Sequence, residues 1–484
     1  MWFHRWVGIV MCLMFATWFA TGAVMVFVAF PSLSAAERDA KSEVIDWARV
    51  RLNPASAQGI LGQAGDLRLV SFDGIPAYVS KAKSGRMLAI SAETGQPVAA
   101  VSREAAARIA GRFQGGPVAG TTGPIDYDQW IVHQQYDPWR PFYRVRFGDR
   151  SGTEAYVSVR TGEVRLTTRR FDRGWTWLGS VIHWMYFVPI RRVFALWDWT
   201  VWVISLVGLS TVVAGIWLGV TRTTTKMQSK RPALSPFRGL LRWHHVIGLF
   251  AGTFILCWIV SGWLSMDHGR LFSEGEAPQV SASAYAGGSS PAPARGFGVE
   301  DLRRLGPSSA VEFQRVAGHE VAAAHGSGLR RVLIGGDAGA TLAERVPASL
   351  ILSAARAGWP MDHVESVTPI AVDSAYAKAE SLPASAVQIK LAGPRPVRLF
   401  VDGISGKILV AMDPSREAYA WVYYMLHTYN FPGLSSRPVL RITLLLIPLS
   451  LGFVFAISGV LVGVRRLRGM RPAASQSRPV STAT

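Results

Sequence analysis

The sequence predicts a membrane protein with four transmembrane α-helices in two tandem repeats, each with an α+β domain outside the membrane. Four apolar stretches are long enough to cross a hydrocarbon core of ~30 Å, which takes ~20 helical residues. They lie at about residues 6–29, 199–220, 246–265 and 440–463. Segments of the first half recur in the second, and basic residues gather in the short segments after the second and fourth stretches. These patterns exclude an ordinary soluble enzyme.

The repeat is clearest where histidines recur. Residues 3–8 match residues 243–248, and the shift of 240 residues places His4 opposite His244. A second alignment has a constant shift of 244 residues and pairs the following positions: Thr161 with Ser405, Gly162 with Gly406, His183 with His427, Gly215 with Gly459, and Arg222 with Arg466. Each half therefore consists of a helix, an outer domain and a second helix, with one histidine near its start and one before its last span.

The elements are expected in a simple order along the chain. They are a transmembrane helix within residues 1–30, an outer domain over 31–182, an interfacial helix region over 183–198, a second transmembrane helix over 199–220, a basic loop over 221–243, a third transmembrane helix over 244–265, a second outer domain over 266–426, a second interfacial region over 427–439, a fourth transmembrane helix over 440–464 and a basic tail over 465–484. Residues 274–297 are rich in Gly, Ser, Ala and Pro, which predicts a flexible linker. The first span resembles a signal peptide, but its internal counterpart favours a retained helix.

The outer domains show the alternation of short strands. In the first domain, residues 77–80, 87–90, 142–147 and 155–159 read as half-buried strands, and an Ala-rich segment near 101–113 reads as a helix. The second domain closes on a similar strand and turn around Gly406. Both are predicted to be small α+β modules.

The net charge of +19 is a topology signal. The loop after the second span and the tail after the fourth carry basic residues and no acid, namely Arg222, Lys226, Lys230, Arg231, Arg238 and Arg242, then Arg465, Arg466, Arg468, Arg471 and Arg478. Short basic segments remain in the cytoplasm, so both termini and the middle loop are predicted to be cytoplasmic. This placement argues against nucleic-acid binding. The two cysteines, Cys12 and Cys257, lie within spans, and no CxxCH motif attaches haem covalently.

The histidines are expected at two levels of the membrane. His183 and His427 lie in aromatic segments that Pro189 and Pro432 interrupt, because proline breaks a helix. Both histidines are therefore predicted on short interfacial helices at the outer edge, where Trp and Tyr are common. His4 and His244 lie at the cytoplasmic edge.

Two facing histidines in a helix bundle can hold haem b without covalent attachment. Gly8 and Gly248 follow His4 and His244 by four residues, so each shares a helix face with its histidine and could leave room for a porphyrin edge. His245 is the alternative to His244, because adjacent helical side chains point about 100° apart. A lone membrane-edge histidine is more often an anchor. A proton relay or metal path would need acidic residues, which the spans almost lack.

The combination of His-x-x-x-Gly at the start of a span, a Thr-Gly-Glu-Val turn, a His-Trp-x-Tyr-Phe element and a second such unit resembles the PepSY-associated transmembrane proteins of bacterial inner membranes. The resemblance covers about residues 3–466. It implies periplasmic PepSY-like domains, an inner-membrane location, and a haem-dependent reductase of ferric siderophores. By resemblance, the axial ligands of two non-covalent haem b groups, and hence of the haem iron, are His4, His244, His183 and His427.

The expected activity is an electron conduit that reduces a periplasmic ferric chelate, such as siderophore iron. Some relatives carry a flavin and nicotinamide domain, whereas this chain has no GxGxxG unit for one. The donor would then be quinol or a separate reductase. Basic residues near the outer edge are candidate contacts for an anionic chelate and equally candidate anchors to lipid headgroups: Arg169, Arg170, Arg173, Arg191 and Arg192. The alternatives are a non-enzymatic PepSY binding or assembly protein and a siderophore or metal permease.

Overall fold

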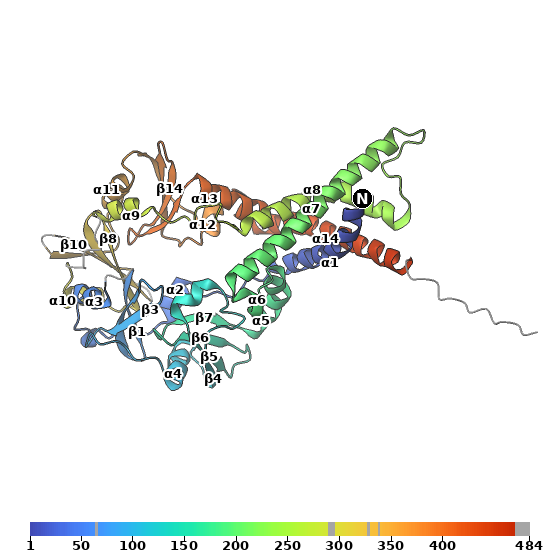
Figure 1. Ribbon diagram of the computed structural model, residues 1–484. Helices are drawn as coiled ribbons and strands as arrows, with labels where there is room; N and C mark the ends of the chain where they lie inside the picture. Colours follow the sequence, from blue (N-terminus) through green and yellow to red (C-terminus); the bar gives the residue numbers. More distant parts are fainter. Residues whose placement is uncertain (63–65, 289–295, 327–329, 337–338, 470–484) are drawn as a thin grey trace, which may run out of the picture.

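Four long helices form a bundle at one end of the computed structural model, which describes residues 1–62, 66–288, 296–326, 330–336 and 339–469 (Figure 1). The helices are α1 (Trp2–Met25), α7 (Phe194–Met227), α8 (Gly239–Ser265) and α14 (Pro438–Gly469). All four are long and apolar enough to cross a membrane. Each starts earlier than its predicted span, and α7 and α14 also end later, because a helix can continue beyond the apolar core. The 34 residues of α7 correspond to ~51 Å at 1.5 Å per residue.

Small residues let the helices approach closely. A Cβ atom on Gly452 would lie 2.7 Å from the ring of Phe19, and one on Gly463 would lie 3.1 Å from Ile9, both on α1. Close contact through glycine is typical of membrane bundles, where packing rather than the hydrophobic effect holds helices together. Between these contacts, buried apolar side chains from all four helices fill the bundle, including Met11, Phe15, Phe19, Val212, Ile255, Trp258 and Leu449.

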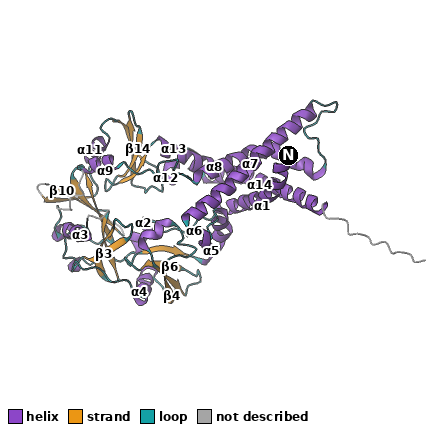
Figure 2. Cartoon of the chain, viewed as in Figure 1, coloured by secondary structure: helices purple, strands orange, loops and turns teal. Residues whose placement is uncertain are grey.

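The remaining helices and strands form the part outside the bundle (Figure 2). The helices are α2 (Ala35–Lys41), α3 (Pro54–Leu61), α4 (Arg103–Gln114), α5 (Arg170–Thr176), α6 (Val188–Arg191), α9 (Gln279–Ala286), α10 (Val299–Arg303), α11 (Ala348–Gly358), α12 (Ala375–Ala379) and α13 (Pro414–Tyr419). The strands are β1 (Leu67–Phe72), β2 (Ile75–Lys81), β3 (Met87–Ser91), β4 (Val118–Ile125), β5 (Phe142–Phe147), β6 (Glu154–Ser158), β7 (Val164–Thr168), β8 (Ala310–Val316), β9 (His319–His325), β10 (Val332–Gly336), β11 (Gly339–Ala343), β12 (His363–Pro369), β13 (Ala386–Ala392), β14 (Val397–Asp402) and β15 (Ile408–Met412).

Each domain contributes one four-stranded antiparallel sheet, with the orders β4-β5-β6-β7 and β12-β13-β14-β15. The last hairpin of each sheet turns at a glycine in the left-handed region, Gly162 (φ 66°) and Gly406 (φ 74°). Only glycine adopts this conformation at little cost. Helix α4 packs its buried face, including Ala106, Ile109 and Phe113, on the first sheet.

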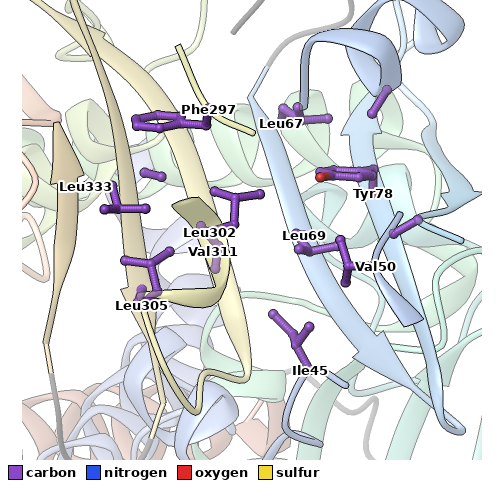
Figure 3. Packing of buried hydrophobic residues seen from close by; sticks show 14 of the residues in the cluster. Ile45, Val50, Leu67, Leu69, Tyr78, Phe297, Leu302, Leu305, Val311 and Leu333 are labelled. Carbon is purple, nitrogen blue, oxygen red and sulfur yellow. The ribbon is translucent and has the colours of Figure 1, made fainter. Parts of the chain in front are cut away.

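The two domains share a third sheet. Its seven strands have the order β11-β10-β9-β8-β1-β2-β3, and the antiparallel pair β1–β8 joins the domains. Figure 3 shows the apolar cluster over this junction, with Leu69 and Tyr78 from the first domain opposite Val311 and Leu333 from the second. The modules that the sequence suggested are therefore connected by backbone hydrogen bonds into one outer unit.

Leu69 is the best place to test this junction. It lies on β1 between β2 and β8 and is fully buried. We expect Leu69→Ala to destabilise the outer unit by about 2–5 kcal/mol, as is usual for a buried leucine. Leu88 on β3 is 40% exposed, so Leu88→Ala should change the stability by less than about 0.5 kcal/mol. Thermal unfolding of the full chain in detergent measures both, and equal melting temperatures for the two variants would contradict the assignment.

Part of the segment that we expected to be a flexible linker is ordered. Within 274–297, residues Gln279–Ala286 form α9, whose Tyr285 is buried and donates its hydroxyl to the carbonyl oxygen of Gly406 at 2.7 Å. Helix α9 packs closely on α11, because a Cβ atom on Gly358 of α11 would lie only 2.9 Å from the carbonyl oxygen of Ser281 on α9. Residues 289–295 of this segment, and the tail from residue 470, lie outside the described residues.

Both domains lie at the same end of the bundle (Figure 1). The N-terminus and the loop between α7 and α8 lie at the other end, which is also where α14 ends. The bundle therefore has a domain end and a basic end.

Candidate functional site

The histidines at the domain end sit on an unusual backbone. After β7, the chain forms α5, a π-helical turn over Trp177–Val181, and then reaches His183. In the second half, α13 leads into a π-helical turn over Ala420–His427. Two residues after each histidine the backbone turns at a non-glycine residue with positive φ, Met185 (53°) and Tyr429 (56°). π-helical turns often occur at functional sites, and such strained residues persist only where the surroundings hold them.

Each of these histidines packs against the first helix of its own half. The Nδ1 atom of His183 is hydrogen-bonded to Thr21 Oγ1 at 3.0 Å, and a Cβ atom on Gly22 would lie 3.5 Å from the ring. The Trp18 indole also donates to the His183 carbonyl oxygen at 3.2 Å. A hydroxyl, a glycine and an indole of α1 thus hold His183.

The second half repeats the arrangement. His427 Nδ1 is hydrogen-bonded to Ser261 Oγ at 3.0 Å, and a Cβ atom on Gly262 would lie 3.1 Å from the His427 ring. Trp258 donates to the His427 carbonyl oxygen at 3.1 Å. Ser261, Gly262 and Trp258 are the residues that the shift of 240 pairs with those around His183.

The rings of His183 and His427 are neutral at ordinary pH. Burial and, to a smaller extent, the positive charge of the nearby His427 lower the pKa of His183 to about 3. Burial also lowers the pKa of His427 to about 4. Because only a neutral imidazole has a lone pair to offer, both histidines are in the form that can bind a metal ion.

The histidines at the basic end pack against the second helix of their own half. His4 Nδ1 is hydrogen-bonded to the carbonyl oxygen of Thr211 at 3.1 Å, and a Cβ atom on Gly215 would lie 2.7 Å from the ring. His244 Nδ1 is hydrogen-bonded to Ser458 Oγ at 2.9 Å. A Cβ atom on Gly459, the counterpart of Gly215, would lie 3.1 Å from the His244 ring.

All four histidines use Nδ1 for these contacts. Within the part of the chain that the structure describes, no hydrogen bond reaches the Nε2 atom of any of the four rings. None of these Nε2 atoms is among the fully buried polar atoms without a partner, so each retains accessible surface. A metal-binding histidine usually anchors its other nitrogen on an oxygen atom, which sets the tautomer and the ring direction. For His4 the carbonyl acceptor requires a proton on Nδ1, so its Nε2 carries a free lone pair.

His245 has a different role from His244. Its Nε2 atom is hydrogen-bonded to the carbonyl oxygen of Gly219 on α7 at 3.1 Å, and its ring meets Phe237 edge-on. Its Nδ1 atom is buried without a partner. The adjacent histidines therefore face different helices, as their 100° separation requires.

The space expected beside Gly248 is filled. A Cβ atom there would lie 2.7 Å from the ring of Phe455, and that ring stacks on His244 with a centroid distance of 4.6 Å. Our expectation of room for a porphyrin edge at Gly248 is therefore wrong, because the glycine admits an aromatic ring of α14. At Gly8 the nearest atom to an added Cβ, a methyl group of Thr211, lies at 3.9 Å.

Residues 1–466 of this 484-residue chain match a protein family that is described as the PepSY-associated TM region. The chain belongs to this family. Together with its four apolar helices, the match makes it a multi-pass membrane protein with PepSY-like domains. No curated protein matches the chain.

The arginines proposed as chelate contacts have different environments in this PepSY-associated chain. Arg169, Arg170 and Arg192 are exposed. Arg173 donates to Thr168 Oγ1 at 2.9 Å and to the Gly152 carbonyl oxygen at 2.9 Å. Arg191 is 1% exposed. These arginines therefore differ in accessibility, and Arg191 cannot meet a large ligand from solution.

The other histidines make separate contacts. His268 Nδ1 lies 2.7 Å from Asp198 Oδ2, and its ring packs against Trp199 and Trp202. His319 Nδ1 bonds the Gly335 carbonyl oxygen at 3.0 Å. Among the described residues, no group of three or more His, Cys, Asp or Glu side chains is placed to hold a metal ion.

Sequence reasoning missed the oxygen partners of the four histidines. Two of them, Thr21 and Ser261, are paired by the shift of 240 and both carry a hydroxyl. A search of the repeat for recurring hydroxyls beside the recurring glycines would have found them. Thr211 would have escaped, because it contributes only its backbone oxygen.

Proposed function

We propose that this protein is a haem b electron conduit of the bacterial inner membrane that reduces a ferric chelate, such as a ferric siderophore, in the periplasm. The single observation that carries the proposal is the matched state of His4, His183, His244 and His427. Each anchors Nδ1 on an oxygen of its own half and leaves Nε2 without a hydrogen bond to any described residue. Incidental membrane-edge histidines would have no reason to share this geometry at four places.

The residues fit two bis-histidine haems, one at each end of the bundle. His4 and His244 would hold the inner haem, since both lie at the basic end of the bundle, where Cys12 of α1 and the His244 ring lie beside the same glycine of α14, Gly459. His183 and His427 would hold the outer haem, since they lie at the domain end on equivalent segments and are anchored on equivalent hydroxyls of α1 and α8. Bound haem b would supply reversible one-electron redox chemistry at each level.

The transmembrane helices would set the distance between the two haem sites and exclude water from the region between them. His4 and Thr21, the partner of His183, are both on α1, and the interval corresponds to ~26 Å at 1.5 Å per residue. The buried side chains of Phe15, Phe19 and Trp258 lie in the core of the bundle and exclude water there. This spacing suits a path from one face of a ~30 Å hydrocarbon core to the other.

The direction of transfer follows from the charge distribution. The basic loop and tail at one end of the bundle favour a cytoplasmic position for that end. The domains would then be periplasmic, with both termini cytoplasmic. Electrons from quinol or a separate reductase would enter near His4 and His244 and leave near His183 and His427. One electron converts iron(III) to iron(II), which hard oxygen ligands hold less tightly, so the chelate would release its iron.

An absorbance spectrum of the purified full-length protein tests this proposal. We expect a Soret band of six-coordinate haem b and its sharpening on anaerobic reduction with dithionite. Addition of a ferric hydroxamate should then reoxidise the haem, with iron(II) captured by a ferrous indicator. Absence of the Soret band would contradict the haem assignment. If the ferric chelate does not reoxidise the reduced haem, the chelate is not the electron acceptor. If proteoliposomes transport labelled chelate without reducing it, the protein is a permease instead.

A further inference from the structure

A groove opens beside His4 at the basic end of the bundle. It lies between the start of α1 and the second half of α7, has a volume of about 580 Å³, and is lined by residues that include Phe3, His4, Ser210, Val213, Ala214 and Trp217. Small-molecule sites usually have ~300–1,000 Å³. Val213 and Trp217 are 50% and 71% exposed on a helix that is apolar enough to span the membrane. The groove is therefore large enough for a small molecule and faces the lipid.

The two halves of the chain differ in what lies beside their inner histidines. In the second half, the ring of Phe455 stacks on His244 with a centroid distance of 4.6 Å. The shift of 244 residues pairs Phe455 with Thr211 in the first half. Thr211 contacts His4 through its backbone carbonyl oxygen and has no aromatic ring to stack on the imidazole. One histidine of the inner pair is therefore covered by a ring of α14, whereas the other lines a groove.

A hydroxyl group interrupts the apolar wall of the groove. Ser210 Oγ donates to the carbonyl oxygen of Leu206 at 2.9 Å, so the same oxygen atom can still accept a hydrogen bond. The residue that the repeat pairs with Ser210 is Val454, which has no hydroxyl. A ligand that matches this wall has an apolar body and a hydroxyl group that donates. The acyl chain of a phospholipid would fill the volume but would leave Ser210 without that donor.

We propose that this groove binds the electron donor and that the donor is a membrane quinol. This inference rests on the proposed function, which leaves the donor open between a quinol and a separate reductase. A quinol combines an apolar isoprenoid tail with a ring that carries two hydroxyl groups, and it reaches the groove by diffusion within the bilayer. One hydroxyl group would donate to Ser210, and the ring would lie beside His4, a ligand of the proposed inner haem.

The reaction balances with the quinol as its only reductant. Each quinol loses two electrons and two protons and becomes a quinone. The electrons pass one at a time from the level of His4 and His244 to the level of His183 and His427, where they convert two iron(III) ions to two iron(II) ions. Met1, which is 61% exposed, lines the same groove, so the two protons leave to water at the basic end.

Stopped-flow reduction of the full-length protein in lipid nanodiscs by decylubiquinol or menadiol tests the site. We expect Val213→Trp to slow haem reduction by at least about tenfold, because the larger side chain fills the groove and excludes the quinol. The haem content and the reduction by dithionite should stay as in the wild type. Val203→Trp is the matched control, because Val203 lies on the same helix and is 45% exposed but does not line the groove. Its rate should not change.

Ser210→Ala tests the hydrogen bond to the quinol. We expect the KM for the quinol to rise about threefold to tenfold, as is usual for the loss of one hydrogen bond. Reduction by dithionite should not change, because dithionite does not use the groove. If Val213→Trp does not fold, the KM of Ser210→Ala decides the question, and an unchanged KM would then overturn the quinol site.

The outcomes separate this inference from the proposed function. An unchanged rate in Val213→Trp would leave the groove to a phospholipid chain and would overturn the quinol site alone. Loss of haem from Val213→Trp, with retention in Val203→Trp, would assign the groove to the haem and would also overturn the quinol site. A wild-type protein whose haem is reduced by dithionite but not by either quinol would do the same. A wild-type protein without haem would overturn both the site and the proposed function.

Discussion

His244→Ala should remove the inner haem and leave the outer haem in place, while His245→Ala should leave both. The two histidines are adjacent on α8, but His244 holds Nδ1 on Ser458 and keeps Nε2 accessible, whereas His245 uses Nε2 for the Gly219 carbonyl oxygen. An axial ligand must offer the lone pair of an accessible ring nitrogen. Both variants replace a histidine with alanine at neighbouring positions, yet only His244→Ala is expected to lose a haem.

Haem stoichiometry measures the difference. The haem-to-protein ratio from the pyridine haemochrome assay should fall by about half in His244→Ala, because loss of one axial ligand releases a non-covalent haem. The remaining haem should keep the potential of the outer site. If His245→Ala loses the inner haem and His244→Ala retains it, His245 rather than His244 is the axial ligand. Selective loss of the outer haem in His244→Ala would show that the proposed pairing of the histidines is wrong.

His183→Ala and His427→Ala should each abolish the outer haem and with it the reduction of the ferric chelate. We expect the rate of iron(II) formation to fall by more than about 100-fold, since loss of a partner that merely orients a ligand typically costs about 10–100-fold. Inner-haem absorbance should persist and should still be reduced by the donor. Stopped-flow oxidation of the pre-reduced protein by ferric hydroxamate gives the rate.

His363→Ala is the control for this pair. His363 is an exposed histidine on β12 of the outer unit, so its replacement should leave haem content and rate unchanged. Equal loss of activity in His363→Ala would point to general damage of the outer unit. Continued chelate reduction without the outer haem would show that electrons bypass His183 and His427, and the two-level path would then have to be abandoned.

Local patterns in the chain were enough to predict much of the fold. The four spans are continuous apolar runs, and the structure places a helix over each. Strand β5 has the predicted bounds of residues 142–147, because alternation of buried and exposed side chains is a property of neighbouring residues. The family resemblance was confirmed over residues 1–466. The recurrence of His4 and His183 at matching later positions could be read directly from the sequence.

Other features depended on contacts between distant segments. The β1–β8 pair joins residues near 70 with residues near 310, and no local pattern specifies the partner of an edge strand. The ring of Phe455 beside Gly248 belongs to another helix, so the space seen in the sequence was already filled. Arg191 and Arg192 look alike in the sequence, yet one is sealed and the other exposed.

For the histidines too, some features can be predicted from the sequence and others depend on the tertiary structure. Their number, spacing and two levels follow from the repeat and from the prolines, because helix length and helix breaks are local properties. Which nitrogen each ring uses depends on oxygen atoms contributed by other segments, such as Thr211 and Ser458. Periodicity places a side chain on a face of its own helix, whereas the identity of its neighbours is set only when the helices pack.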